Sequence, residues 1–137
     1  MLEIGSTAEA IYVVGDGDMA SSFRVTPDDT FPQVFSTARM IALMETASGR
    51  VLRPLLQAGQ MSVGVLVNIK HLAATPNHTK VSARATFLGM EGKLYRFRIE
   101  AFDGGGKIGE GEHTRAIVDM ERLIQGAKTR NQAAGAN

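Results

Sequence analysis

The stretch STARMIALMETASGRVLRPLL, residues 36–56, decides the fold. Its apolar side chains recur at spacings of three and four residues, which is the period of an α-helix. The residues of this stripe are Met40, Leu43, Met44, Ala47 and Val51. Further apolar residues widen the stripe until little of the helix remains to face water, so we expect a helix that is packed on more than one side. Ser36 or Thr37 provides a cap at its start, and Pro54 predicts an end or a kink near Arg53.

Outside this helix the sequence has the pattern of β-strands. One strand precedes the helix, and four long runs with a period of two follow it, separated by turns rich in glycine, proline or asparagine. The strand ahead of the helix is residues 8–14, and the four runs are approximately residues 63–71, 81–88, 95–101 and 108–120. Consecutive strands at hairpin spacing favour antiparallel pairing. We therefore predict an α+β domain in which one curved, mostly antiparallel sheet wraps around one long central helix.

The length and composition are those of an ordinary globular protein of one domain. Its 137 residues suffice for one packed core and not for two. We assign residues 1–125 to this domain. We expect residues 126–137, GAKTRNQAAGAN, to form a frayed polar tail, because they show no apolar period. A net charge of +1 provides no attraction for nucleic acid, so nucleic-acid binding is not predicted.

Features that the sequence lacks narrow the choice further. It has no cysteine, which excludes disulfides and cysteine-based zinc sites, and its three histidines are too scattered for a local metal motif. No apolar run approaches the roughly 20 residues that a transmembrane helix needs, so no membrane association is predicted. The first ten residues, MLEIGSTAEA, do not have the pattern of a signal peptide. We therefore expect the protein to act in the cytoplasm.

Two titratable side chains stand in apolar surroundings. Glu45 lies within the predicted helix, where a carboxylate removed from water requires a partner or takes up a proton, and such a group suits general acid–base chemistry. His71 is in phase with Val63, Val65 and Val67, so we expect it on their face of the strand unless a bulge intervenes. A neutral imidazole there can act as a base. The alternatives are a surface glutamate paired with an arginine and a histidine with a structural role.

Three further residues are candidates for contact with a substrate. Thr37 stands eight residues before Glu45; a hydroxyl at a helix start is usually a cap, and it can also be a nucleophile or a donor beside a base. Gly64 interrupts a strand of bulky residues, which indicates a bulge, a close packing contact or a backbone N–H open to an oxyanion. Arg115 in the last strand can meet a phosphate, although most single basic residues are solvated.

Four segments, taken together, are specific enough to indicate a family. They are FPQVFST at residues 31–37, ARMIALMETA at residues 38–47, HLAATP at residues 71–76 and GEHTRAIV at residues 111–118. In order and spacing they closely resemble the fluoroacetyl-CoA thioesterase family, a branch of the hotdog-fold thioesterases. The resemblance covers approximately residues 30–120. It implies the hotdog fold, in agreement with the α+β architecture expected from the periodicity.

The resemblance also implies roles for particular residues. By motif position it assigns the catalytic set to Thr37, Glu45 and His71. It assigns contacts with the substrate to Gly64 through its backbone N–H, to Arg115, and to Phe31 as a gate of the acyl pocket. The implied activity is hydrolysis of a small acyl-CoA to the free acid and coenzyme A by a cytoplasmic homodimer. No metal or cofactor is implied, since coenzyme A is part of the substrate.

Several points are left open by the sequence. Asp28 stands where the fluoroacetyl enzymes carry a second aromatic residue in the lid, so the acyl group is undetermined. Attack by Thr37 with an acyl-enzyme intermediate and direct attack by water are both compatible with the residues. Two other classes stay as alternatives, a non-catalytic acyl-CoA-binding hotdog module and an enoyl-CoA hydratase. A hydratase usually pairs an aspartate and a histidine in a different local motif.

Overall fold

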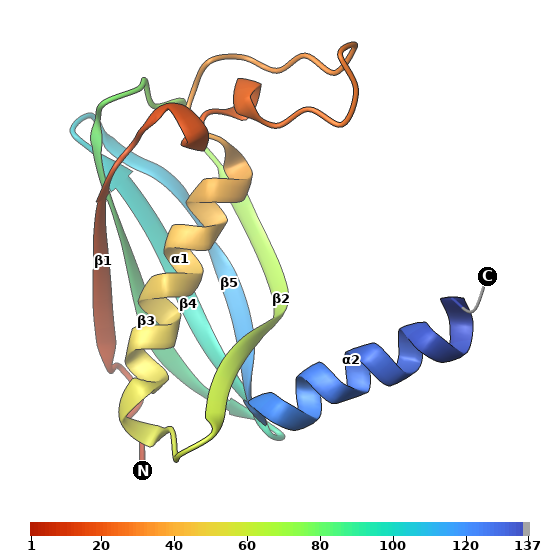
Figure 1. Ribbon diagram of the computed structural model, residues 1–137. Coiled ribbons are helices and arrows are strands. Elements are labelled where there is room, and N and C mark those ends of the chain that lie inside the picture. The colour runs from red at the N-terminus through yellow and green to blue at the C-terminus, as the bar shows by residue number, and fades with distance from the viewer. Residues whose placement is uncertain (136–137) are drawn as a thin grey trace.

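The computed structural model describes residues 1–135, which form one sheet, one central helix and one projecting helix (Figure 1). The strands are β1 (Thr7–Val13), β2 (Gln60–His71), β3 (Lys80–Glu91), β4 (Leu94–Asp103) and β5 (Gly106–Asp119). The helices are α1 (Thr37–Leu52) and α2 (Met120–Gly135), with short 3-10 turns at Asp16–Asp18, Ala20–Ser22 and Arg53–Leu55. No helix in this described part of the chain is long and apolar enough to span a bilayer.

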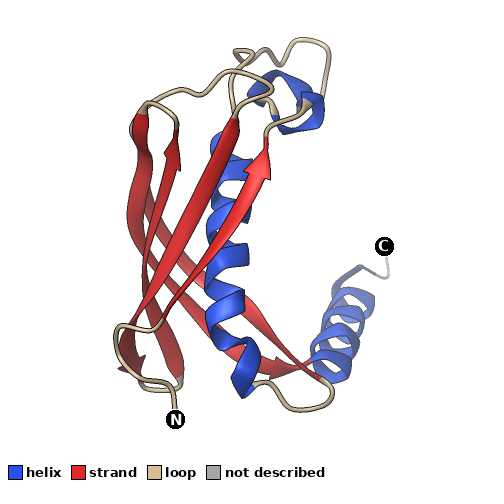
Figure 2. Ribbon diagram, turned by 90° about the vertical axis from the view of Figure 1, so that its left-hand side faces the viewer, coloured by secondary structure: helices blue, strands red, loops and turns tan. Residues whose placement is uncertain are grey.

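The five strands form a single antiparallel sheet in the order β1-β3-β4-β5-β2. The sheet curves around α1, which lies along one face of it (Figures 1 and 2). The predicted α+β architecture is therefore confirmed. Strands β1 and β2 form the two edges, and β2 is the strand that follows α1 directly in the chain.

Helix α1 begins and ends where the local chemistry predicts. The Ser36 hydroxyl accepts a hydrogen bond from the backbone N–H of Arg39 at 3.1 Å, which satisfies one of the free donors at the helix start. The helix ends at Leu52, and the 3-10 turn that contains Pro54 follows it. Its buried residues are Met40, Leu43, Met44, Ala47, Ser48, Val51 and Leu52. Burial of this face against the sheet is the main source of the domain's stability.

Close packing of α1 on the sheet depends on a small residue of β5. A Cβ at Gly109 would lie 2.7 Å from the Met40 sulfur, so the Met40 side chain occupies the space that the glycine leaves free. Gly109 pairs with His71 across the β2–β5 ladder. The start of α1 and the end of β2 are thereby brought together.

A β-bulge in β2 changes which side chains face α1. Gly64 pairs with Arg115 and Leu66 pairs with Thr114, so Val65 is the extra residue. Past the bulge, His71 lies on the face of Gly64 and not on that of Val63. The bulge is the exception that the prediction for His71 allowed: His71 keeps the face of Val67 but not that of Val63. The bulge is also one of the readings predicted for Gly64.

The C-terminal segment differs from the expected frayed tail. Residues 120–135 form helix α2, and residues 136–137 lie outside the described part of the chain. The Asp119 carboxylate accepts the backbone N–H of Arg122 at 2.9 Å and caps the helix start. The residues of α2 are exposed, and the helix runs away from the sheet beyond the β2 edge (Figure 1). The polar sequence thus forms a solvated helix in place of an irregular tail.

Candidate active site

Glu45 and Arg115 form an ion pair between α1 and β5. The Arg115 Nη1 donates to Glu45 Oε2 at 2.9 Å. The same guanidinium donates to the Ser62 hydroxyl at 3.1 Å and to the Ser62 carbonyl at 2.9 Å. Arg115 is only 7% exposed, whereas the Glu45 side chain is 39% exposed. A buried, fully engaged arginine therefore holds one oxygen of a carboxylate that solvent or a substrate can still reach.

His113 is a further hydrogen-bond partner of Arg115. Its Nδ1 lies 2.7 Å from the Leu66 carbonyl, which can only accept, so Nδ1 carries the proton and Nε2 is free to accept from Arg115 Nη1 at 3.2 Å. Burial lowers the pKa of His113, and the Arg115 charge lowers it further, while the Leu66 carbonyl and the Glu45 carboxylate oppose this shift. His113 is thus a neutral imidazole that positions Arg115.

Gly64 lies directly beneath the Glu45 carboxylate. A Cβ at this position would stand 3.0 Å from Glu45 Oε2 and 3.2 Å from Cε1 of His113. Of the readings that the sequence allowed, the structure therefore shows a bulge together with a close approach. The lack of a side chain leaves room for the Glu45 carboxylate close to the strand backbone.

Thr37 and His71 form a second polar pair. Thr37 Oγ1 lies 2.7 Å from Nδ1 of His71, which joins the first residue of α1 to the last residue of β2. Burial lowers the pKa of His71, and the Ala73 carbonyl opposes this shift. A neutral imidazole in this position can accept the hydroxyl proton of Thr37, as in pairs of a hydroxyl nucleophile and a base.

Phe31 lies near the Thr37–His71 pair. It is 54% exposed and lines an open depression together with Thr37 and His71. The other apolar walls include Pro32, Val34 and Leu72. The phenylalanine therefore stands at the mouth of the depression, where a gate for an acyl group would have to be.

The six predicted residues thus fall into two groups within one chain. Glu45, Gly64 and Arg115 are together, and so are Phe31, Thr37 and His71. The eight residues from Thr37 to Glu45 correspond to about 12 Å along a helix, and the seven from Gly64 to His71 to roughly 20 Å along a strand. No hydrogen bond found within residues 1–135 joins the two groups. The threonine, glutamate and histidine do not meet at one point in a single chain.

Two residues that contact the first group were not predicted from the sequence. Ser62 and His113 hold Arg115, and neither was a candidate. The available signal was the period of two, because His113 stands two residues before Arg115 on the same face of β5. The Ser62 contact had no signal of this kind, since it depends on the pairing of β2 with β5 around the bulge.

Comparisons with known proteins identify the family of this chain. The family model described as fluoroacetyl-CoA-specific thioesterase matches residues 14–121. The fluoroacetyl-CoA thioesterase of Streptantibioticus cattleyicolor is 39% identical over 93 residues, which is 68% of this chain and 67% of that protein. A structure of the fluoroacetyl-CoA thioesterase FlK has a TM-score of 0.88 at 30% identity and covers 94% of this chain and 97% of its own.

Two further structures extend the comparison. A FlK variant in complex with fluoroacetate and CoA has a TM-score of 0.83 at 32% identity, with 88% of this chain and 98% of that chain covered. A hot-dog-like protein from Thermanaerovibrio acidaminovorans shares the fold, with a TM-score of 0.78 at 22% identity and 94% of this chain and 93% of that chain covered. The fold is the hotdog fold, and the chain belongs to the fluoroacetyl-CoA-specific thioesterase family.

Proposed function

We propose that this acyl-CoA thioesterase hydrolyses a small acyl-CoA to the free acid and coenzyme A at a site shared by two copies of the chain. The observation that carries the proposal is the division of the site residues. One group provides a carboxylate beside an open strand backbone, and the other provides a hydroxyl hydrogen-bonded to an imidazole. Each group is half of a hydrolytic site.

The free edge of β2 supports a homodimer. This strand is 12 residues long and has a neighbour, β5, on one side only. Its exposed apolar residues include Met61, Val65, Leu66 and Val67, which are 38–54% exposed. A long apolar edge strand is a template for pairing with another chain. Two copies joined by a two-fold axis perpendicular to the sheet would pair their β2 strands antiparallel, with both α1 helices on the same side.

This pairing can unite the two groups. If the axis passes through Asn68, Gly64 of one copy lies opposite the partner's His71, because Val65 is the extra residue of the bulge. The Glu45 group of one copy then faces the Thr37 and His71 pair of the other, and the dimer has two equivalent sites. Because the two groups are far apart within one chain, a complete site forms only when two chains associate. Coenzyme A would lie along the junction of the two subunits.

The chemistry that follows is a hydrolysis that needs no metal or cofactor. The thioester carbonyl oxygen receives the Gly64 N–H, a kind of contact whose removal typically costs ~10²–10³ in rate. Either Thr37 gives its proton to His71 and attacks the carbonyl carbon, or water gives its proton to Glu45 and attacks directly. The C–S bond breaks, and the sulfur leaves with a proton from the side chain that received it. On the covalent route, water then hydrolyses the acyl-threonine.

A panel of short, branched, halogenated and aryl acyl-CoAs with detection of the released thiol tests the proposal. We expect Glu45→Gln and His71→Ala to lose about 10²–10⁴-fold in turnover, the usual contribution of an acid–base group. Glu9→Gln, at the far edge of the sheet, and His78→Asn, in an exposed turn, are matched controls that should retain turnover. A burst of thiol before the steady state would identify the covalent route.

Three outcomes of this panel would contradict the proposal. One is full turnover in both Glu45→Gln and His71→Ala on every acyl-CoA. The second is binding of acyl-CoA without thiol release, as a non-catalytic module would show. The third is loss of enoyl absorbance with crotonyl-CoA without thiol release, which would indicate a hydratase.

A further inference from the structure

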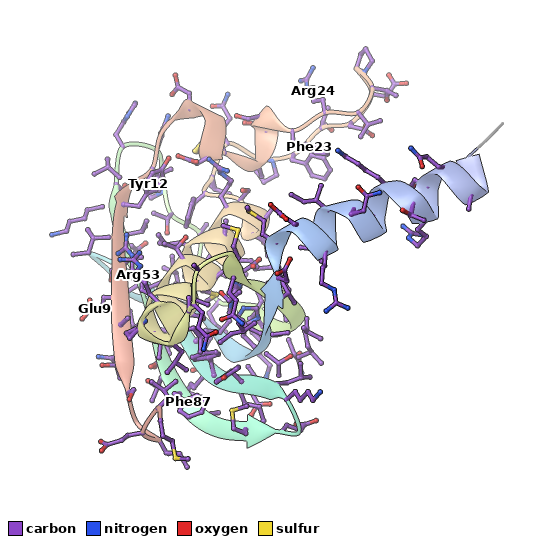
Figure 3. All side chains as sticks on the ribbon, turned by 60° about the horizontal axis from the view of Figure 1, so that its bottom comes forward. Glu9, Tyr12, Phe23, Arg24, Arg53 and Phe87 are labelled. Carbon is purple, nitrogen blue, oxygen red and sulfur yellow. The ribbon has the colours of Figure 1, made fainter. Side chains whose placement is uncertain are left out.

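Two segments of the chain carry apolar side chains that residues 1–135 leave largely exposed. The loop of residues 23–31, called the entry loop here, has Phe23, Val25 and Phe31 exposed at 68%, 77% and 54%. Helix α2 has Met120, Leu123 and Ile124 exposed at 38%, 46% and 47%. The Phe23 side chain stands out from its loop in Figure 3. Exposed apolar clusters of this kind usually mark a surface that binds another molecule.

The apolar side chains of α2 form one face of the helix. Met120, Leu123, Ile124 and Ala127 follow each other at spacings of three and four residues, so they share a stripe along the helix. Within the subunit, α2 contacts the end of β5 that it leaves, and the Met120 N–H donates to the Gly59 carbonyl at 2.9 Å. The stripe therefore needs a partner from outside the chain.

The positions of the two segments indicate which molecule this is. The entry loop and α2 both project beyond the β2 edge, and both do so on the side of the sheet that carries α1 (Figures 1 and 2). They stand at opposite ends of β2, because the loop precedes the first turn of α1 beside His71, whereas α2 starts beside Gln60. A two-fold axis at the middle of β2 exchanges these two ends. It carries the entry loop of one copy to the end where the other copy's α2 projects.

The charges of the two segments have opposite sign. Residues 23–31 contain Arg24, Asp28 and Asp29, which give a formal charge of −1. Residues 120–135 contain Glu121, Arg122, Lys128 and Arg130, which give a formal charge of +2. The apolar stripe of α2 is thus bordered by cations that match an acidic loop, which favours a second copy of this chain over an unrelated partner.

We infer that α2 of each subunit packs its apolar stripe on the entry loop of the partner and holds that loop over the partner's Thr37–His71 depression. The inference rests on the proposed dimer. It assigns a function to the C-terminal helix, because the loop that α2 supports carries Phe31, which lines the depression. The closing of the acyl pocket in one subunit then depends on the tail of the other.

Cross-linking tests the contact directly, since the chain has no cysteine of its own. The double variant Phe23→Cys with Ile124→Cys is treated with a short bismaleimide, and its mass is read on a denaturing gel. We expect a covalent dimer, because within one chain the two sites stand at opposite ends of β2. The matched control, Ile11→Cys with Ile124→Cys, places one cysteine on the far edge strand β1 and should stay monomeric on the gel.

A second pair of variants measures the effect on the site. Leu123→Asp with Ile124→Asp removes the apolar stripe, and we expect a several-fold rise in KM for the acyl-CoA with little change in kcat and with the dimer intact. Gln125→Asp with Gln132→Asp adds the same charge on the opposite face of α2 and should leave KM unchanged.

Sedimentation of the protein that has not been cross-linked distinguishes failure of the α2 contact from failure of the dimer. A dimer in solution that gives no covalent dimer on the gel, or an unchanged KM after loss of the stripe, would overturn the α2 contact and leave the proposed dimer in place. A monomer in solution would overturn the proposed dimer itself. The thiol-release panel tests the hydrolytic function independently of the dimer and of the α2 contact.

Discussion

Gly64 is the residue at which the site has no room for a side chain. We expect Gly64→Ala to reduce thiol release strongly, because the added methyl group would stand 3.0 Å from Glu45 Oε2 and would displace the carboxylate from the strand backbone. Overpacking of this kind costs about 1–3 kcal/mol of stability. The measurement is kcat for the best acyl-CoA together with the denaturant midpoint.

Gly104→Ala is the matched control for this substitution. Gly104 lies in the β4–β5 turn, and a Cβ there would have no neighbour within 4 Å. We expect this variant to retain both activity and stability. Wild-type kcat in Gly64→Ala would show that the close approach to Glu45 has no part in catalysis.

The buried His113 and the half-buried His71 predict a dependence of stability on pH. Burial lowers the pKa of both His71 and His113 below the ordinary value of 6.5. The unfolded chain therefore binds protons at these sites at a higher pH than the folded chain does. Their contribution to stability is complete above about pH 6.5 and is lost as the pH falls through the lower folded pKa. Thermal unfolding over a pH series checks this, and a midpoint that is flat below about pH 6.5 would contradict it.

Strand β2 is the element on which assembly depends in our proposal. Leu66 is 49% exposed on this edge, and we expect Leu66→Lys to shift the protein from dimer to monomer, because a pair of like charges close to the two-fold axis opposes strand pairing. Ile11→Lys is the matched control, since Ile11 is 61% exposed on the opposite edge strand. Sedimentation velocity measures whether each of the two variants is a dimer or a monomer.

Thiol release should follow the state of assembly. If the two groups of site residues meet only across the β2 junction, monomeric Leu66→Lys loses activity although Glu45, His71 and Thr37 are all present. A monomeric variant with full activity would show that one subunit forms the complete site.

For the whole molecule, mixed dimers provide the sharpest prediction. Glu45→Gln and His71→Ala are each expected to be inactive alone. When the two proteins are unfolded and refolded together, half of the dimers are mixed, and each mixed dimer has one site with neither substitution. We therefore expect recovery of about a quarter of wild-type thiol release, which follows from the two-fold symmetry of the assembly.

The same experiment distinguishes the alternative arrangement. If Glu45 and His71 of one chain served the same site, every site in the mixture would lack one of them, and no activity would return. Refolded wild-type protein provides the reference for the yield of active dimer.

Periodicity alone determined most of the secondary structure. The helix from Thr37 to Leu52 and the strands that follow it were predicted from apolar spacing, because that pattern is set by residues within a few positions of each other. Helix α2 was not predicted, although Asp119 and the stripe from Met120 to Ala127 are local signals for it, because its composition is polar and its residues are exposed.

The sequence by itself determined the kind of side chains at the site, through motifs that also identify the family. Only the tertiary structure decided their grouping. The bulge at Gly64 sets which face His71 occupies, Ser62 and His113 reach Arg115 from two strands, and the spacing along α1 and β2 keeps Glu45 away from His71. These relations join residues that are up to 70 positions apart in the chain. They depend on strand register and packing, which no local pattern contains.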